Sequence, residues 1–562
     1  MKSSSQLDIM LREIDHKGYP AYKSLKGAYD FGNYSLSIDH VQGDPFASPS
    51  RLTIHITDKA SGFSPDLWRT PDRKTAFCDF LLRRFAKEIQ EYSFQARGSG
   101  KSGALFTTRP GQEVLGRTAC TIDRDSHTIL VRFEAGFPAN GRTINARELK
   151  KILFDYLPRA VKNALYSRNT DQKALRNAID LYEDQQALRI LLTENELAAF
   201  VADGAVLPRR SGVSNAPLPG AVPFSSPDSL RISLTLPHRG TVTGMGIRRG
   251  ITLIVGGGYH GKSTLLKALE AGVYNHVSGD GREFVITDAT AVKLRAEEGR
   301  VVKKVDISPF INHLPNKKDT RLFSTEDASG STSQAAGVVE GMEAGTGLFL
   351  IDEDTCATNF MVRDELMQRV IAPDKEPITP FLARIRPLYE EYGISTILVV
   401  GSSGAFFRKA DTIIQMDSYH AVDITDFAKK EAALVPAAEK DVSFPSVNLS
   451  RRLCLSVGKR EDSRGVKIRT MGKDSLSFDR ETIDLRYVEQ LVDEEQTRAL
   501  GSILQYLMIH GHPDASLSDQ LRHLYETLTS EGLESIVSSD CPPFLALPRL
   551  QEIFACVNRC RF

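Results

Sequence analysis

The stretch GITLIVGGGYHGKSTLLKAL, residues 250–269, decides how this chain folds. An apolar run at 251–255 is typical of a buried strand, a glycine-rich turn follows, and helix-forming residues continue from Ser263 onward. Within the turn, Gly256, Gly261, Lys262 and Ser263 fit the pattern GxxxxGK[ST] of a phosphate-binding loop. A strand before such a loop and a helix after it are the context that phosphate binding requires.

The residue types in this loop predict how it binds a nucleotide. Glycines let backbone N–H groups converge on the α- and β-phosphates, and the helix N-terminus adds a favourable partial charge. Lys262 would reach the β- and γ-phosphates, the Ser263 hydroxyl would bind Mg²⁺, and Thr264 would add a phosphate contact. We therefore expect ATP and Mg²⁺ as ligands. The expected nucleotide contacts are Gly256, Gly257, Gly258, Tyr259, His260, Gly261, Lys262, Ser263 and Thr264.

About ninety residues further on, GLFLIDEDTCATNF (347–360) ends an apolar strand in two adjacent carboxylates. Asp352 would hold Mg²⁺ through water, and Glu353 would orient or deprotonate the attacking water. Acidic residues also follow many buried strands without any catalytic role. The position of this pair after the phosphate-binding loop favours the catalytic interpretation.

Between these motifs, RLFSTEDASGSTSQAA (321–336) places Ser329, Gly330 and Ser331 just before an expected helix. They resemble the LSGGQ signature of ABC ATPases, in which a serine and a glycine at a helix N-terminus donate to a γ-phosphate bound by the opposite subunit. This interpretation predicts a homodimer. The alternative is a Ser/Gly loop that only caps a helix.

Taken together, the motifs resemble those of one family, the predicted ATPases of the ABC class, some of whose relatives are linked to mitochondrial RNA processing. The resemblance implies an ABC-like core with N- and C-terminal additions, a homodimer that encloses ATP, and RNA binding through a basic central channel. The segments that carry it are RGSGKSG (97–103), AGFPANGRTINA (135–146), GGGYHGKSTLL (256–266), DASGSTSQAA (327–336), LFLIDEDTCATNFMVRD (348–364) and IDLRYVEQLVDEEQTRAL (483–500).

Two departures from ordinary ABC ATPases bear on the reaction. No glutamine occurs between Thr264 and Gln334, and Asp306 lies at about the right distance to replace the missing metal-binding glutamine. After an expected strand at 395–400, Ser402 and Ser403 stand where a switch histidine normally follows. A serine can hydrogen-bond a γ-phosphate but cannot carry the charge of an imidazole. We therefore expect slow hydrolysis that depends on Glu353, Lys262 and one of these serines.

Composition limits the class of protein. The chain has 562 residues, and its 71 Lys and Arg balance its 71 Asp and Glu, so the molecule as a whole is not a polyanion binder. No apolar run is long enough to cross a bilayer, and the N-terminus lacks the apolar core of a signal peptide. The chain has seven cysteines, an odd number, and they are scattered along the sequence, which indicates reduced thiols. We expect a cytoplasmic protein without a membrane partner.

The expected fold class is α/β, with an ABC-type P-loop core of mostly parallel sheet and flanking helices, and with α+β domains on either side. We expect a helix at 74–92, strands at 51–57 and 127–134, and helices over almost all of 147–203. A Pro/Gly/Ser-rich stretch reads either as a linker or as a packed arm. The domains follow as 1–203 (N-terminal), 204–229 (linker or arm), 230–428 (ATPase core) and 429–562 (C-terminal).

Local basic clusters provide candidate nucleic-acid contacts in a neutral protein. RGSGKSG at 97–103 looks like a second phosphate-binding loop, but Gln95 replaces its first glycine and no strand precedes it, so we interpret it as a flexible basic loop. Residues 451–473 form a second cluster, which includes Arg451. Solvated surface charge is the alternative for both. The candidate contacts are Arg97, Lys101, Arg109, Arg142, Arg464 and Lys467.

Three functions remain open at this stage. The first is a nucleotide-switched homodimeric clamp that acts on RNA or another nucleic acid. The second is a P-loop phosphotransferase for a small molecule, which needs an acceptor pocket instead of a signature from a second subunit. The third, a transporter ATPase subunit, is disfavoured because the added domains are large.

Overall fold

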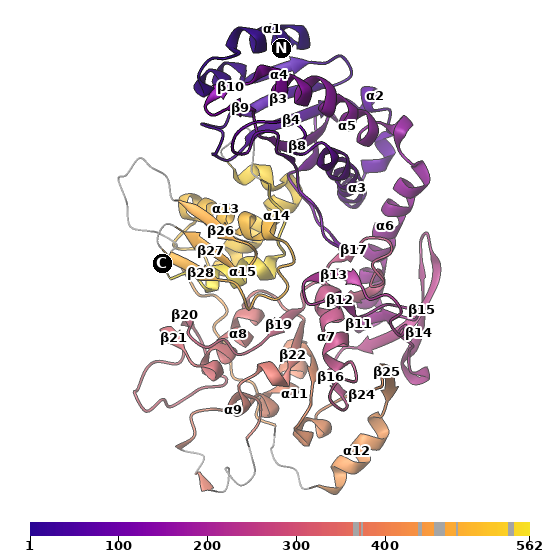
Figure 1. The fold of residues 1–562 in the computed structure, drawn as a ribbon. Coiled ribbons are helices and arrows are strands. Elements are labelled where there is room, and N and C mark those ends of the chain that lie inside the picture. Colours follow the sequence, from indigo (N-terminus) through magenta and orange to yellow (C-terminus); the bar gives the residue numbers. More distant parts are fainter. Residues whose placement is uncertain are drawn as a thin grey trace. The chain divides into compact units, whose positions relative to one another are not determined.

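Helix α6 (Gln172–Glu194) carries the chain from one structural unit to the next (Figure 1). The computed structural model describes residues 1–363, 370–371, 375–435, 441–453, 467–478, 481–537 and 544–561. One unit comprises Met1–Glu183 with Glu531–Leu547, and the other comprises Asp184–Ser530 with Pro548–Phe562. These units do not coincide with the four segments suggested by the sequence, because parts of the C-terminal region belong to each unit.

The first unit is built on a mostly antiparallel sheet with strand order β1-β2-β3-β4-β8-β5, in which β7 also pairs with β8. Its long central strands, β4 and β8, pair over their whole length, from Ser50 with Ala135 to Ile56 with Ile129. The strands are β1 (Lys2–Ser3), β2 (Gly27–Asp30), β3 (Ser35–His40), β4 (Ser50–Ile56), β5 (Leu105–Phe106), β7 (Cys120–Ile122) and β8 (Ile129–Ala135).

Helix α3 (Pro71–Glu91) contributes two phenylalanines to the core of this unit. Phe77 and Phe85 are fully buried, and the Phe85 ring meets Phe133 of β8 edge-on at 5.9 Å between centroids. The expected helix at 74–92 and the two expected strands are thus confirmed, and the unit is α+β as predicted. The remaining helices are α1 (Ser4–Ile14), α2 (Asp58–Ser61), α4 (Ala146–Lys151) and α5 (Leu157–Ala164).

One expected helix is in part a strand. Residues Leu197–Ala202 form β11, which is buried at every position and pairs with β15 on one side and β18 on the other. An apolar run that is buried on both faces has no periodicity to separate strand from helix. The antiparallel sheet has the order β14-β15-β11-β18, with β14 (Arg231–Leu236), β15 (Gly240–Arg248) and β18 (Val285–Thr287).

The Pro/Gly/Ser-rich stretch 204–229 is a packed arm of the second unit. Gly204 N–H donates to the Phe224 carbonyl and Phe224 N–H donates to the Ala205 carbonyl, each at 2.8 Å. Between these points lies the hairpin β12 (Arg209–Ser211) and β13 (Ser214–Pro217), and Arg209 pairs at 2.7 Å with the fully buried Asp280. These contacts favour the arm over the linker.

A six-stranded sheet forms the centre of the second unit, with order β19-β22-β23-β16-β24-β25. All pairs are parallel except the last, β24 with β25, so the expected parallel P-loop sheet is confirmed. The strands are β16 (Ile251–Val255), β19 (Val292–Leu294), β22 (Leu348–Asp352), β23 (Ser395–Val399), β24 (Thr412–Asp417) and β25 (His420–Asp423). The helices of this part are α7 (Lys262–Ala271), α8 (Gly330–Glu343), α9 (Thr358–Met361), α11 (Phe381–Tyr392) and α12 (Thr425–Leu434).

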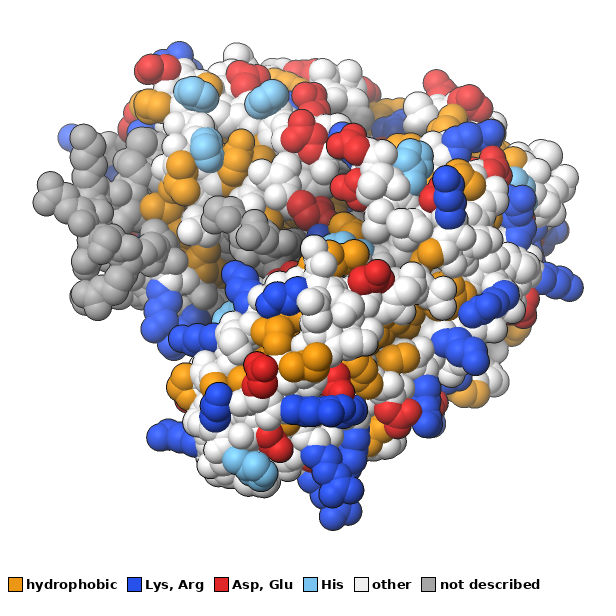
Figure 2. Space-filling model, turned by 90° about the horizontal axis from the view of Figure 1, so that it is seen from above, with side chains coloured by type: hydrophobic (Ala, Val, Ile, Leu, Met, Phe, Trp, Pro, Cys, Tyr) orange, Lys and Arg blue, Asp and Glu red, His pale blue; other side chains and the backbone are white. Residues whose placement is uncertain are grey.

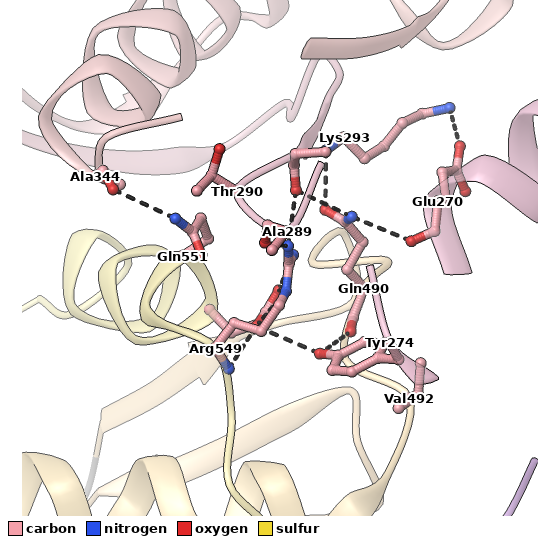
Figure 3. A network of polar contacts seen from close by, with 12 residues as sticks. Glu270, Tyr274, Ala289, Thr290, Lys293, Ala344, Gln490, Val492, Arg549 and Gln551 are labelled. Carbon is pink, nitrogen blue, oxygen red and sulfur yellow. Dashed lines mark hydrogen bonds and ion pairs between the residues drawn. The ribbon is translucent and has the colours of Figure 1, made fainter. Parts of the chain in front are cut away.

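C-terminal elements of the second unit pack on the part that contains the six-stranded sheet through buried polar contacts (Figure 3). Tyr274, just after α7, donates its hydroxyl to the Gln490 carbonyl at 2.9 Å, and the Gln490 amide donates to the Glu270 and Ala291 carbonyls. Arg549 donates to the carbonyls of Ala289 and Ala291. The elements are β26 (Ile468–Met471), β27 (Ser475–Phe478), β28 (Glu481–Asp484), α13 (Glu494–His510), α14 (Leu517–Glu531) and α15 (Leu550–Asn558).

The surface carries both signs of charge. On the face drawn in Figure 2, Lys and Arg side chains (blue) and Asp and Glu side chains (red) both reach the surface, as the balanced composition leads one to expect. Among the described residues, no helix combines the length and the apolar character that a bilayer-spanning segment needs.

Candidate nucleotide-binding site

The glycine-rich turn joins β16 to α7 at the carboxyl end of the central parallel strand. Gly256 has φ +135°, and a Cβ at this position would lie 2.3 Å from the Met416 carbonyl oxygen of β24. Only glycine allows the chain to leave β16 in this conformation so close to a neighbouring strand. The local fold therefore matches the strand–turn–helix arrangement that the motif predicts.

Lys262 is the first residue of α7, and its ammonium group lies over the turn. Its Nζ donates to the Gly256 carbonyl at 2.7 Å and to the Gly257 carbonyl at 2.8 Å. These two carbonyls hold the Lys262 ammonium group over the turn. The N–H groups of the turn and the N-terminus of α7 favour an anion at the same place. The residues present thus fit a triphosphate, and Ser263, the next residue of α7, is exposed at the helix start.

The tip of the loop is attached to the turn between β24 and β25. His260 Nδ1 accepts from Ser418 N–H at 2.9 Å and lies 3.2 Å from the Asp417 carboxylate. A Cβ on Gly261 would lie 3.3 Å from the Tyr419 ring, which is half exposed beside the loop. The sequence does not single out this turn, because only the pairing of β16 with β24 brings it to the loop.

Strand register brings the second motif to the same edge of the sheet. Ile254 of β16 and Asp352 of β22 both pair with Val399 of β23, from opposite sides. Strands lie about 4.8 Å apart, so the P-loop and Asp352 are separated by about 10 Å, with the end of β23 between them. Asp352 is 9% exposed, and its Oδ1 accepts a long contact of 3.4 Å from Asp354 N–H.

The turn after β23 holds the carboxylate of Glu353. Gly401 N–H and Ser402 N–H donate to Oε2 at 2.8 and 3.0 Å, and the Ser402 hydroxyl donates to Oε1 at 2.8 Å. Burial acts to raise the pKa of Glu353, but the hydrogen bonds from Ser402 and Gly401 outweigh it and hold the pKa below its ordinary value. Glu353 is therefore an ionised, fixed carboxylate on the same edge of the sheet as the P-loop.

The other residues expected near the γ-phosphate have structural contacts. The Ser403 hydroxyl accepts from Ala405 N–H at 3.3 Å and so begins a short turn of helix. Both oxygens of Asp306 are engaged, one by the Ser308 hydroxyl at 2.6 Å and the other by Asn448 N–H at 3.2 Å. For Asp306, this geometry favours a structural role over the metal ligand that the sequence suggested.

The signature-like segment lies at the start of helix α8. Ser329 is the N-cap, and its hydroxyl accepts from Thr332 N–H at 3.4 Å. Gly330 N–H donates to the Glu298 carboxylate at 2.8 Å. Ser331 is buried in the first turn. The expected helix is confirmed, and the amide at its start already binds an anionic group.

The candidate nucleic-acid residues are only partly brought together. Ser99 N–H donates to the Ala139 carbonyl at 2.7 Å and Gly141 N–H donates to the Ser99 hydroxyl at 2.9 Å, so Arg97, Lys101 and Arg142 lie on two joined turns of the first unit.

The glycine turn at 97–103 that carries two of these cations is tightly packed. A Cβ on Gly136 would lie 1.8 Å from the Lys101 carbonyl oxygen, and a Cβ on Gly103 would lie 2.0 Å from that of Ala96. This close backbone packing at Gly103 and Gly136 favours a fixed turn over the flexible loop that the sequence suggested.

The remaining basic candidates lie elsewhere or outside the described residues. Arg109 lies in the loop between β5 and Glu113, Lys467 precedes β26 in the second unit, and Arg464 lies outside the part of the chain that the structure describes. Arg451, from the second basic cluster, is buried in an ion pair of 2.7 Å with Glu343 of α8. It is part of the core and not of a surface cluster, which the sequence alone could not show.

Family models match nearly the whole chain. The P-loop domain of the ABC_ATPase family matches residues 171–449, the "ATPase of the ABC class N-terminal" domain matches 4–168, and the "MRB1590 C-terminal domain" matches 467–562. The chain belongs to the ATPases of the ABC class. This ABC-class ATPase therefore has the expected P-loop core between family-specific N- and C-terminal regions.

Individual relatives are distant. The uncharacterized protein MJ1628 of Methanocaldococcus jannaschii is 30% identical over 297 residues, which cover 50% of this chain and 60% of that protein. Among solved structures, cbiO1 from Clostridium perfringens has a TM-score of 0.26 at 12% identity and covers 42% of this chain and 93% of its own. The dimeric ATP-binding cassette MJ0796, bound to ADP and Pi, has a TM-score of 0.20 at 10% identity, with coverage of 34% and 94%.

Proposed function

We propose that this ABC-class ATPase hydrolyses ATP slowly, and that ATP closes a homodimer in which the P-loop of one subunit faces the signature segment of the other. The closed dimer would act as a clamp on RNA or another nucleic acid. Slow hydrolysis, closure by two subunits and the nucleic-acid partner are separate parts of this proposal. Each is supported by different residues and each has its own test.

The observation that carries the ATPase proposal is the fixed position of Glu353. Its carboxylate is held by Gly401 and Ser402 at the end of β23, and β23 is the strand next to the one that leads into the P-loop. A carboxylate at this edge can orient a water molecule toward a γ-phosphate that the Lys262 ammonium binds. Ser263 and Asp352 would hold Mg²⁺, which when bound neutralises charge that develops on the phosphates.

Two features of the site support a low rate. The hydrogen bonds that lower the pKa of Glu353 also make it a weaker base, so it orients water better than it removes a proton. The turn after β23 offers the Ser402 hydroxyl where an imidazole would bring a positive charge, and that hydroxyl is already bonded to Glu353. We therefore propose that Ser402 positions Glu353, and that Ser403 is the serine left to contact the γ-phosphate.

Steady-state ATP hydrolysis by three variants tests the catalytic assignment. Glu353→Gln should lower kcat by about a hundredfold or more while ATP is still bound, since general-base or water-orienting groups contribute factors of this size. Lys262→Ala should lose ATP binding. Asp354→Asn is the matched control, because Asp354 is the exposed carboxylate next in the chain, and it should stay within about twofold. Equal activity of Glu353→Gln and Asp354→Asn would contradict the assignment.

Support for the second subunit comes from the start of α8. Gly330 N–H faces an anion, and Ser329 places a hydroxyl beside it, which is the donor set that suits a γ-phosphate. A γ-phosphate that is bound by one P-loop and by the α8 start of the partner links two chains only while ATP is intact. Sedimentation of Glu353→Gln with and without ATP and Mg²⁺ measures this link.

The nucleic-acid part rests on the joined turns of the first unit. Arg97, Lys101 and Arg142 are exposed there on two backbone segments that hydrogen bonds fix together. Cations at fixed positions can contact successive phosphates of a strand. The test is the salt dependence of binding to a fluorescent single-stranded RNA.

The slope of log affinity against log salt is negative. Replacing all three cations by glutamine should make this slope shallower by about 2. The matched control replaces three exposed cations on other parts of the unit, Lys59, Lys87 and Arg124, which should leave the slope within about 0.5. An unchanged slope in the first variant would refute this surface as the RNA contact.

A further inference from the structure

The signature amide of this chain is already occupied by a side chain of the same chain. Gly330 N–H, the first amide of α8, donates to Glu298 Oε2 at 2.8 Å. Glu298 is an exposed residue, so solvent can replace the Gly330 amide as the partner of its carboxylate when the side chain moves away. A carboxylate on the N-terminal amide of a helix satisfies the same donor and dipole that a phosphate oxygen would.

Neighbouring residues hold Glu298 in this position. Ala296 N–H donates to the Thr355 carbonyl at 3.0 Å, and Thr355 ends the short helix that begins at Glu353. Glu297 N–H donates to the hydroxyl of Ser333 on α8 at 2.9 Å. The three residues 296–298 thus connect the catalytic carboxylate's own turn to the first two turns of the signature helix.

The C-terminal helix α15 fixes the middle of this segment. Arg559, the residue after α15, donates from Nε to Glu297 Oε2 at 3.1 Å, and Arg300 lies 3.8 Å from the same carboxylate. Burial acts to raise the pKa of Glu297, but Arg559 and Arg300 outweigh it and keep the pKa low, so Glu297 stays ionised and paired. The C-terminal region therefore sets where Glu298 lies.

We propose that Glu298 is an intrachain competitor for the γ-phosphate: it occupies the signature amide in the open protein and must leave before ATP on a partner subunit can bind there. This inference rests on the proposed ATP-closed homodimer. Because Glu298 also places a negative charge beside the incoming phosphate, it raises the ATP concentration at which the dimer closes. The opposite role, a cap that orients Gly330 for the phosphate, would make Glu298 favour closure.

The test measures ATP-dependent dimerisation in the Glu353→Gln background, in which closed dimers accumulate. Adding Glu298→Gln removes the competing charge. A surface charge at a helix N-terminus contributes a factor of about two to five per site, so with two sites the dimerisation constant should rise between about fourfold and about twenty-five-fold. The matched control is Glu326→Gln, an exposed carboxylate on β21 (Phe323–Ala328) just before the signature, which should change the constant by less than about twofold.

The outcomes separate this inference from the function on which it rests. Dimerisation that is unchanged or weakened by Glu298→Gln, or strengthened equally by Glu326→Gln, overturns the competitor role while the ATP-closed dimer stands. Absence of a dimer at saturating ATP in both backgrounds refutes the dimer itself, and the competitor role with it. Glu298→Asp keeps the charge but shortens the side chain by one methylene. A rise in the dimerisation constant that is smaller than the rise caused by Glu298→Gln supports the inference. Dimerisation weaker than that of the Glu353→Gln variant alone contradicts it.

Discussion

Replacing Gly256 by alanine should break the P-loop from within, and the structure gives the size of the effect. Gly256 has φ +135°, a conformation that costs an L-residue about 1–3 kcal/mol. The new Cβ would also lie 2.3 Å from the Met416 carbonyl oxygen, where ordinary contacts begin at 3.4 Å. Forcing such contacts apart costs about 1–3 kcal/mol more. We expect Gly256→Ala to lower the free energy of unfolding of the second unit by about 2–6 kcal/mol.

Gly258→Ala is the matched control in the same loop. A Cβ on Gly258 would meet nothing within 4 Å, and its φ is not positive, so the free energy of unfolding should change by less than about 0.5 kcal/mol. Urea denaturation followed by circular dichroism measures the difference. Trp68, the single tryptophan of the chain, lies in the first unit, so its fluorescence reports a transition that neither variant should move. Equal denaturation midpoints for the two variants would refute the steric argument.

Three further variants test other contacts. Ser402→Ala removes a hydrogen bond to ionised Glu353 and should therefore raise the pKa of Glu353. The acid limb of the kcat–pH profile should then move to higher pH. An unmoved acid limb would show that the hydroxyl does not stabilise the charge. Arg451→Gln leaves buried Glu343 without its cation and should cost about 3–5 kcal/mol of stability by urea denaturation, whereas a loss under about 1 kcal/mol would contradict the buried pair. Tyr274→Phe leaves the Gln490 carbonyl without its donor and should cost about 1–3 kcal/mol, and a neutral result would show that other donors replace the hydroxyl.

The motif residues could be predicted because each depends on its own neighbourhood. A strand, a glycine turn and a helix start within twenty residues define the P-loop, and the apolar strand ending in Asp352 and Glu353 is visible in the same way. The parallel sheet followed from alternating strand and helix patterns. In each case, the local pattern and the tertiary fold agree.

The contacts that fix these residues could not be predicted, because they depend on strand order. Glu353 meets Ser402 only because β22 lies beside β23, and the turn at Ser418 reaches His260 only because β24 lies on the other side of β16. Arg451 looked like a surface cation, since sequence does not show that Glu343 of α8 lies opposite it in the core. Glu298 carries no motif at all, and its contact with Gly330 appears only in the folded chain.

Mixing two inactive variants tests most directly whether one nucleotide is shared by two subunits. Lys262→Ala destroys the P-loop and leaves the signature intact, while Gly330→Asp places a carboxylate at the signature and leaves the P-loop intact. Only a mixed dimer contains one complete site, made from the intact P-loop of one chain and the intact signature of the other. In an equal mixture that pairs at random, about half of the dimers are mixed, and each mixed dimer has one complete site of two. The mixture should therefore restore about a quarter of the wild-type ATPase rate. A mixture no more active than the sum of its two components would contradict the shared site.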